Sequence, residues 1–328
     1  MMPSLRLSGQ RALWAMAGVA IIGVVLPLLL RSDFWLNFAI MVLFFTVLGQ
    51  AWNILGGYGG QFSFGHAAFF GTGAYVTAVL QVKFGINPWL GFVLAGIGGG
   101  LVGAAIGFLS FRYGLRGSYF ALVTLAFAEV LRILANAAAF TGGGVGTLIP
   151  LKQTAANFQF VDKTGFYFVI FALMLIGLLL AYWLENSRFG ARLMAIRENE
   201  DAARALGVNA FAIKLGAISL SGALAGLAGA FYAQYFLYLD PRLAYGPGIS
   251  VEALLVPIIG GMGTIFGPLL GATVLHVVGE IARKVMGDAV GLNLALYGMV
   301  LVAMVLFLPN GIAGLARRQR LKPKEERL

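Results

Sequence analysis

The sequence predicts an all-α protein that crosses a membrane about ten times, within a range of eight to ten. Of its 328 residues, 60% are hydrophobic and 11% are charged, less than half of the roughly 25% usual in soluble domains. A helix needs about 20 apolar residues to cross the hydrocarbon core. Charge-free windows on this scale recur along the chain, at 12–30, 34–82, 84–111, 164–184, 215–239, 253–279 and 289–316. We therefore expect a single transmembrane domain over residues 1–328.

The first window follows Arg6 and Arg11 and has some features of a secretory signal. It is longer than the apolar core of a signal peptide, and the sequence "LPLLLRSDF" that ends it offers no small-residue cleavage site. The first window is therefore interpreted as a retained membrane span.

The second window, 34–82, is too long for one span, and the motif "GGYGG" at 56–60 divides it into two equal runs. These runs, 34–55 and 61–82, are expected to be the second and third spans. The next four are expected at 88–109, 118–138, 165–184 and 215–236. The motif "GGMGTIFGP" at 260–268 breaks the following region, and a final span is expected at 289–308. Two short helices around the break give ten crossings, whereas a re-entrant hairpin gives eight or leaves the count open.

Basic residues predict the orientation, because Lys and Arg favour the cytoplasmic side of a membrane. In the ten-span arrangement, one side receives 15 of the 23 Lys and Arg residues. Both termini then lie in the cytoplasm, together with the charged segment 185–214 and a basic tail at 309–328. The formal net charge of +10 is explained by this asymmetry and by attraction to anionic lipid, so it does not require a nucleic-acid partner.

The segment "AIRENEDAARALGVN" at 195–209 concentrates five charges in an otherwise apolar chain. A single helix at 193–206 would place its charged side chains on one face and its apolar ones on another. The charged face would hold Arg197, Glu200, Asp201 and Arg204, and the apolar one Ile196, Ala203 and Leu206.

Two short helices are the alternative structure for this segment. Asn199 would cap the second helix, with Glu200 and Asp201 in its first turn, where acidic residues are favourable. In either case Gly207 suits the left-handed position that ends a helix. The segment is then either a solvated connector or a docking surface for a cytoplasmic partner.

Several classes of site are excluded by the sequence. It contains no G-x-x-x-x-G-K-[ST] motif, so the chain lacks the phosphate cradle of a P-loop ATPase. It contains no cysteine, which removes disulfides and thiolate metal sites. Its two histidines lack carboxylate partners at ligand spacing. We therefore expect no metal site, no cofactor and no catalytic residues in this chain.

Four motifs carry a resemblance to a known family: "GGYGGQFSFGHAAFFGTGAY" at 56–75, "SRFGARLMAIRENEDAARALGVN" at 187–209, "LSGALAGLAGAFYA" at 220–233 and "GGMGTIFGPLLGA" at 260–272. The chain resembles the permease subunits of branched-chain amino acid ABC importers, in particular the LivM type, from about residue 35 to 310. The resemblance implies a type II importer architecture with two halves of inverted orientation.

The resemblance also implies partners and a location. These are a second, related permease, two cytoplasmic ATPases that bind ATP and Mg²⁺, and a periplasmic or extracellular binding protein, assembled on a bacterial or archaeal cytoplasmic membrane. The segment 185–214 becomes the coupling segment seated in an ATPase cleft. Its candidate contact residues are Gly190, Ala195, Arg197, Glu198, Asn199, Asp201, Ala202 and Gly207.

The two glycine-rich breaks are candidates for unwound backbone beside the transport path, because irregular backbone at membrane depth is tolerated only against protein or a water-filled cavity. Alternatively, small residues let helices approach closely. The segments 57–63 and 261–267 match at three of seven positions, which is compatible with repeated halves. The candidate residues are Gly59, Gly60, Gln61, Ser63, His66, Gly260, Gly261 and Gly263.

Glu129 and Arg132 lie three positions apart on the fifth span and are expected to form a structural ion pair, with a substrate contact as the alternative. Three functional hypotheses remain open. The first is an importer permease for leucine, isoleucine and valine; the second is the same architecture with urea, short amides or other amino acids as cargo. The third, a stand-alone secondary transporter or channel, should show a buried charge relay and no coupling segment.

Overall fold

The computed structural model describes residues 9–286 apart from Arg31, together with 298–299, 302 and 311–312. The expected final span at 289–308 and the tail at 309–328 lie almost wholly outside the described residues. Within the described part, seven segments are long and apolar enough to cross a membrane. The protein is thus mainly helical and multi-pass, as the sequence predicts.

The break in the 34–82 window lies later than predicted. After α1 (Gly9–Leu29), α2 (Asp33–Trp52) continues into the π-helix η1 (Asn53–Tyr58), and α3 spans His66–Phe84. The prediction that the third span begins at residue 61 is therefore wrong. Gly56 and Gly57 stay helical, and the helix ends only at Tyr58; two residues later, Gly60 takes a φ of +66° that glycine adopts without strain.

Helix α9 (Ala210–Phe236) packs extensively against α3 and against α4 (Pro88–Arg112). Glycines bring these backbones together: a Cβ on Gly99 of α4 would lie 2.3 Å from the carbonyl oxygen of Gly222, and one on Gly73 of α3 would lie 2.1 Å from that of Gly226. Small residues at helix contacts are the usual means of association in lipid, where no hydrophobic force drives helices together. This three-helix group forms the centre of the fold.

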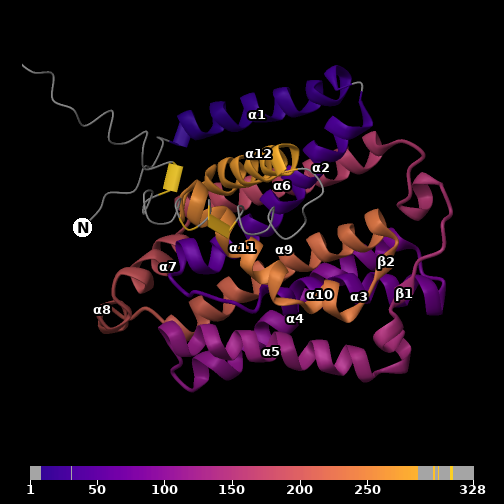
Figure 1. Cartoon of the computed structure of the whole chain (residues 1–328). Helices are drawn as coiled ribbons and strands as arrows, with labels where there is room; N and C mark the ends of the chain where they lie inside the picture. Colours follow the sequence, from indigo (N-terminus) through magenta and orange to yellow (C-terminus); the bar gives the residue numbers. More distant parts are fainter. Residues whose placement is uncertain (1–8, 31, 287–297, 300–301, 303–310, 313–328) are drawn as a thin grey trace, which may run out of the picture.

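Helices α1 and α5 (Gly117–Ala137) lie on opposite edges of the molecule (Figure 1). Helix α6 (Lys163–Asn186) packs against α2, and α11 (Pro247–Gly260) packs against α12 (Gly267–Met286) and α2. The short helices α7 (Arg188–Glu198) and α8 (Glu200–Ala205) lie at one end of the long helices.

The opposite end carries a small cap formed by the long link between α5 and α6. Strand β1 (Thr147–Leu148) pairs antiparallel with β2 (Tyr238–Leu239), which leads into α10 (Pro241–Tyr245) (Figure 1). The link also contains the 3-10 turns η2 (Ala139–Thr141), η3 (Gly143–Val145) and η4 (Ala155–Asn157). Loop structure therefore gathers at two ends, with the helices between them.

Candidate coupling site and its glycine loops

The charged segment forms two short helices, which confirms the second of the two structures that the sequence allowed. Ser187 caps α7 by accepting a hydrogen bond from the backbone N–H of Gly190 at 3.0 Å. The side-chain oxygen of Asn199 accepts from the N–H groups of Asp201 and Ala202, each at 3.0 Å, and so begins α8. Asn199 is extended, and it sets the two helices in different directions.

Two glycines shape this segment for different reasons. A Cβ on Gly190 would lie 1.7 Å from the carbonyl oxygen of Leu184, so only glycine lets α7 fold back against the end of α6. Gly207 has a φ of +82°, and a Cβ added there would meet no atom within 4 Å, so its constraint is conformational alone. The expected left-handed position of Gly207 is confirmed.

Most of the predicted contact residues are exposed; they are Ala195, Arg197, Glu198, Asn199, Asp201, Ala202 and Gly207, whereas Gly190 is buried. The apolar face predicted for a single helix does not form as a unit. Ile196 and Ala203 are buried, but Leu206 is 86% exposed. The physical reason is the break at Asn199 together with the position of Leu206 beyond the end of α8.

Glu200 has a role that the sequence did not reveal. Its side chain is only 7% exposed, and three cationic groups surround its carboxylate. Arg204 Nη2 lies 2.7 Å away, Lys214 Nζ 3.1 Å and Arg116 Nε 3.2 Å. Lys214 is itself buried, with 1% exposure, and lies over the ring of Phe111. The nearest sequence signal was the i, i+4 spacing of Glu200 and Arg204.

The neighbouring carboxylates are also paired. Arg116 Nη2 lies 3.1 Å from Asp201 Oδ1, and this hydrogen bond holds the pKa of the Asp201 carboxyl below its usual range. Arg197 Nη2 donates to Glu198 at 2.8 Å and likewise lowers the pKa of Glu198. Both carboxylates are exposed, so these pairs orient side chains at the surface and contribute little stability.

The two glycine-rich loops lie against each other beneath α7. The Asn53 side chain donates to the carbonyl oxygen of Thr264 at 3.1 Å and accepts from the N–H of Gly263 at 2.8 Å. Arg197 on α7 donates from Nη1 to the carbonyl oxygen of Gly57 at 2.8 Å. The structure therefore joins the first glycine-rich segment directly to the coupling segment, and Asn53 joins the second one to the first.

This adjacency changes the meaning of the sequence match between 57–63 and 261–267. Two loops that meet side by side connect their helices at the same end of the molecule. Interrupted helices of inverted halves can also meet near the middle of the membrane, so the inverted arrangement of the two halves stays a prediction. The second segment is also tightly folded on itself. A Cβ on Gly260 would lie 1.7 Å from the carbonyl oxygen of Gly267, and Gly261 has a φ of +127°.

The polar residues of the first loop are buried among neighbouring helices. His66, at the start of α3, lies 3.2 Å from the Ser63 hydroxyl through Nδ1 and 2.9 Å from the Ser221 hydroxyl through Nε2. Ser221 in turn donates to the carbonyl oxygen of Ala51 at 2.6 Å. Gln61 is buried as well. This network links the loop to α2 and α9.

Glu129 and Arg132 form a two-point salt bridge on α5, with Nη2 2.5 Å from Oε1 and Nε 2.8 Å from Oε2. The pair lies on the open side of α5, with 48% and 26% side-chain exposure respectively. Exposed apolar residues such as Leu122, Val130 and Ile133 occupy the same helix.

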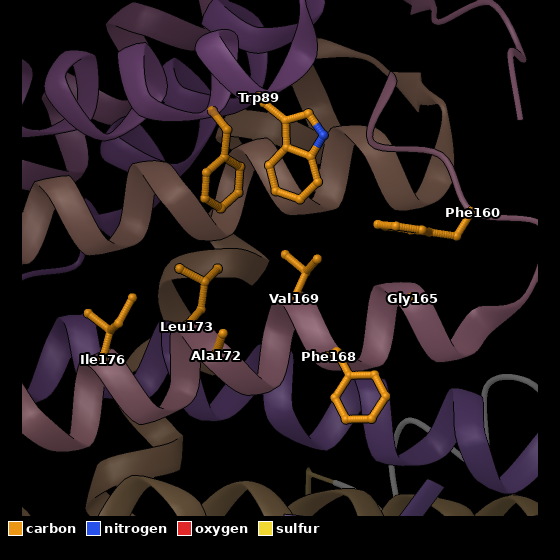
Figure 2. Close-up of a pocket in the computed structure, with 9 residues that line it drawn as sticks. Trp89, Phe160, Gly165, Phe168, Val169, Ala172, Leu173 and Ile176 are labelled. Atoms are coloured by element: carbon orange, nitrogen blue, oxygen red, sulfur yellow. The ribbon is translucent and has the colours of Figure 1, made fainter. Parts of the chain in front are cut away.

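An apolar crevice of about 490 Å³ separates the start of α4 from α6. Figure 2 shows Val169 and Leu173 of α6 pointing toward Trp89 across it. Its lining carries no charged group to pair with an ammonium or carboxylate, so the chemistry of this crevice suits hydrocarbon. Among the described residues, no group of three or more His, Asp or Glu side chains could hold a metal ion.

Comparison with known proteins decides the family. The family model of the branched-chain amino acid transport system permease component matches residues 34–307, which include both glycine loops and the coupling segment. The chain belongs to this permease family. As a member, the permease is a multi-pass protein of the inner membrane.

Named relatives agree with this assignment. Over 307 residues, the permease is 31% identical to the high-affinity branched-chain amino acid transport system permease protein LivM of Salmonella typhimurium and 30% identical to that of Escherichia coli. Both alignments cover 86% of this chain and 71% of the relative. It is 27% identical over 267 residues to a probable branched-chain amino acid transport permease protein LivH of Methanocaldococcus jannaschii, covering 77% of this chain and 82% of that one.

Proposed function

We propose that this chain is a pore-forming permease subunit of an ATP-driven importer for leucine, isoleucine and valine. The observation that carries the proposal is the contact of Arg197 with Gly57, because it connects an exposed, charged segment directly to η1, the end of the membrane helix that begins as α2. A stand-alone transporter has no use for such a connection. Membership of the branched-chain amino acid permease family supports the choice of cargo.

The proposed complex contains a second, related permease, two cytoplasmic ATPases and an external binding protein. The chain has no P-loop, so ATP and Mg²⁺ would bind to the ATPases, and the permease itself would need no cofactor. Each chain offers one coupling segment, which seats one ATPase, so a second permease must seat the other. The proposed arrangement has about ten spans in two inverted halves with both termini in the cytoplasm; the basic-residue asymmetry supports its orientation.

The candidate residues receive roles within this proposal. The exposed residues of α7 and α8 would contact the ATPase, and Leu206 would be an apolar contact on that surface, because covering its exposed side chain removes apolar area from water. The loop residues Gly59, Gly60, Gln61 and Ser63, together with His66 at the start of α3, would pass movement from the coupling segment to α3. The loop residues Gly260, Gly261 and Gly263 would do the same for α12.

The Glu129–Arg132 pair would face the second permease or the shared path. Charged groups at membrane depth are costly in lipid and usually face protein or water. Because the pair is open on the isolated chain, a partner or an aqueous path must cover it in the complex.

The test is uptake by proteoliposomes. This chain alone should show neither ATPase activity nor leucine uptake, whereas the chain with the second permease, two ATPases and a leucine-loaded binding protein should show ATP-dependent uptake. Uptake by the chain alone under an ion gradient would reverse the conclusion in favour of a secondary transporter. Uptake of autoinducer 2 is assayed in parallel. A segment of 164 residues is also 29% identical to an autoinducer 2 import system permease protein, LsrC, of Salmonella typhi.

A further inference from the structure

The Glu200 carboxylate lies where four structural elements meet. It belongs to α8, Lys214 to the first turns of α9, Arg116 to the link between α4 and α5, and the Phe111 ring beneath Lys214 to the end of α4. No other carboxylate of the described residues has three cationic partners within 4.0 Å.

The geometry of this cluster is tightly constrained. Lys214 is 1% exposed and would carry an uncompensated buried charge without Glu200. Buried ion pairs add little net stability compared with apolar packing, but removal of one partner is strongly unfavourable. The cluster therefore adds little to the stability of the fold, but it fixes the position of α8 relative to α4 and α9.

Arg116 extends this arrangement to α5. It contacts both Glu200 and Asp201 on α8, and it is also the N-terminal cap residue of α5, directly before Gly117. One side chain therefore connects α8 to the beginning of α5. Helix α5 lies at the edge of the molecule and carries Glu129 and Arg132 on its open side (Figure 1).

We propose that Glu200 is a positioning residue that couples movement of the coupling segment to α5, with Arg116 as the link between them. This inference rests on the proposed importer function. It assigns to a buried residue, distinct from the exposed contact residues, the task of turning ATPase movement into displacement of one membrane helix.

Transport by the complete complex in proteoliposomes provides the first test. Glu200→Gln keeps the side-chain shape but removes the charge, and Arg116→Gln removes the link. Both variants should retain the bound ATPases and their basal hydrolysis, while leucine uptake falls by about tenfold, a typical size for coupling between two sites. The ATP hydrolysed per leucine should rise accordingly. Arg283→Gln, which breaks an exposed i, i+3 pair with Glu280, is the matched control and should leave both rates unchanged.

Helix movement provides the second test and does not depend on transport. The chain contains no cysteine, so Tyr119→Cys on α5 and Ala205→Cys on α8 can carry a pair of spin labels without further changes. In the complex, the distance between the labels should stay narrowly distributed with and without ATP. In Glu200→Gln and in Arg116→Gln, the distribution of distances should broaden. In Arg116→Lys it should be narrower than in Arg116→Gln.

The outcomes separate the two proposals. Failure of the unmodified complex to take up leucine overturns the proposed function, whereas the label distances still report on Glu200. Normal uptake in both Gln variants, or an unchanged narrow distance in Glu200→Gln, overturns the positioning role. If Glu200→Gln does not insert, the Arg116 variants decide the question alone, because Arg116 is partly exposed and its loss leaves Lys214 paired with Glu200.

Discussion

Arg197 donates a hydrogen bond from Nη1 to the carbonyl oxygen of Gly57 at 2.8 Å, across 140 positions of sequence. Its stem also packs on Gly60, where an added Cβ would lie 2.5 Å from the Arg197 Cγ. A Cβ on Gly263, in the other glycine loop, would lie 3.0 Å from Arg197 Nη1. One side chain of the coupling segment thus contacts the loops that begin α3 and α12.

Arg197→Gln should therefore reduce uptake. The shorter amide cannot span the distance to Gly57, and loss of a charge-assisted hydrogen bond costs about 1.5–3 kcal/mol. Arg197→Lys should retain part of the activity, because an ammonium group can reach one of the two partners, Gly57 and Glu198, but not both. Uptake and ATPase rates in proteoliposomes measure the effect. Full activity of Arg197→Gln would show that the loops do not depend on this contact.

The orientation of the chain is tested with single cysteines. Ala205→Cys, exposed at the end of α8, should react with a membrane-impermeant thiol reagent only in inside-out vesicles. Thr154→Cys, exposed in the link between α5 and α6, should react only from the outside. The expected result follows from the excess of Lys and Arg near α7 and α8. Labelling of both positions from the same side would refute the proposed threading.

Local features of the coupling segment were predictable from sequence because their causes are local. Asn199 caps α8 through bonds two and three residues away, and Gly207 is a left-handed residue that follows a short helix. Both signals lie within a few residues of the element that they end, and general capping preferences are sufficient to interpret them.

The Glu200 cluster and the paired loops could not be predicted in this way. Arg116 and Asp201 are 85 positions apart, and Asn53 and Gly263 are 210 apart. The glycines of "GGYGG" were interpreted as a helix break, although Gly57 is glycine because a Cβ there would lie 2.6 Å from the backbone N of Gly263. Close approach of distant backbones and a flexible turn both require glycine, and only the fold distinguishes them.

Gly207→Val should lower uptake, whereas Gly207→Asn should be tolerated. The φ of +82° costs roughly 1–2 kcal/mol for most residues but little for asparagine, which visits this region readily. Nothing lies within 4 Å of a Cβ at this position, so size alone is not penalised. Comparison of uptake by the two variants, at equal amounts in the membrane, separates strain from steric exclusion. Equal activity of Val and Asn variants would contradict the conformational explanation.

Gly190→Ala should destabilise the junction of α6 and α7. The added methyl group would lie 1.7 Å from the carbonyl oxygen of Leu184, and backbone shifts of this kind cost about 1–3 kcal/mol. Gly18→Ala, where nothing lies within 4 Å, is the matched control. The melting temperature of the purified protein in detergent should fall for the first variant and stay the same or rise slightly for the second, because alanine favours the interior of helix α1 over glycine. Equal melting temperatures would show that α7 can move away from α6 at no cost.

Leu206 should be an anchor for the ATPase. Leu206 is 86% exposed on a segment whose other exposed residues are mainly charged or small, so a partner that covers it gains the free energy of removing apolar area from water. Full burial of a leucine side chain contributes about 1.5–3 kcal/mol, so its loss corresponds to roughly tenfold weaker binding or more. Leu206→Asp should therefore reduce the amount of ATPase that co-purifies with the tagged permease, and Leu206→Ala should reduce it by less.

Val145→Asp is the matched control for this measurement, because Val145 is 85% exposed but lies at the opposite end of the molecule, beside β1 (Figure 1). This variant should leave the amount of co-purified ATPase unchanged. If Val145→Asp reduces co-purification as much as Leu206→Asp, the loss reflects a general effect of a new surface charge. If neither variant reduces it, the ATPase is held by the charged residues of α7 and α8 alone, and Arg197 and Asp201 become the contacts to substitute next.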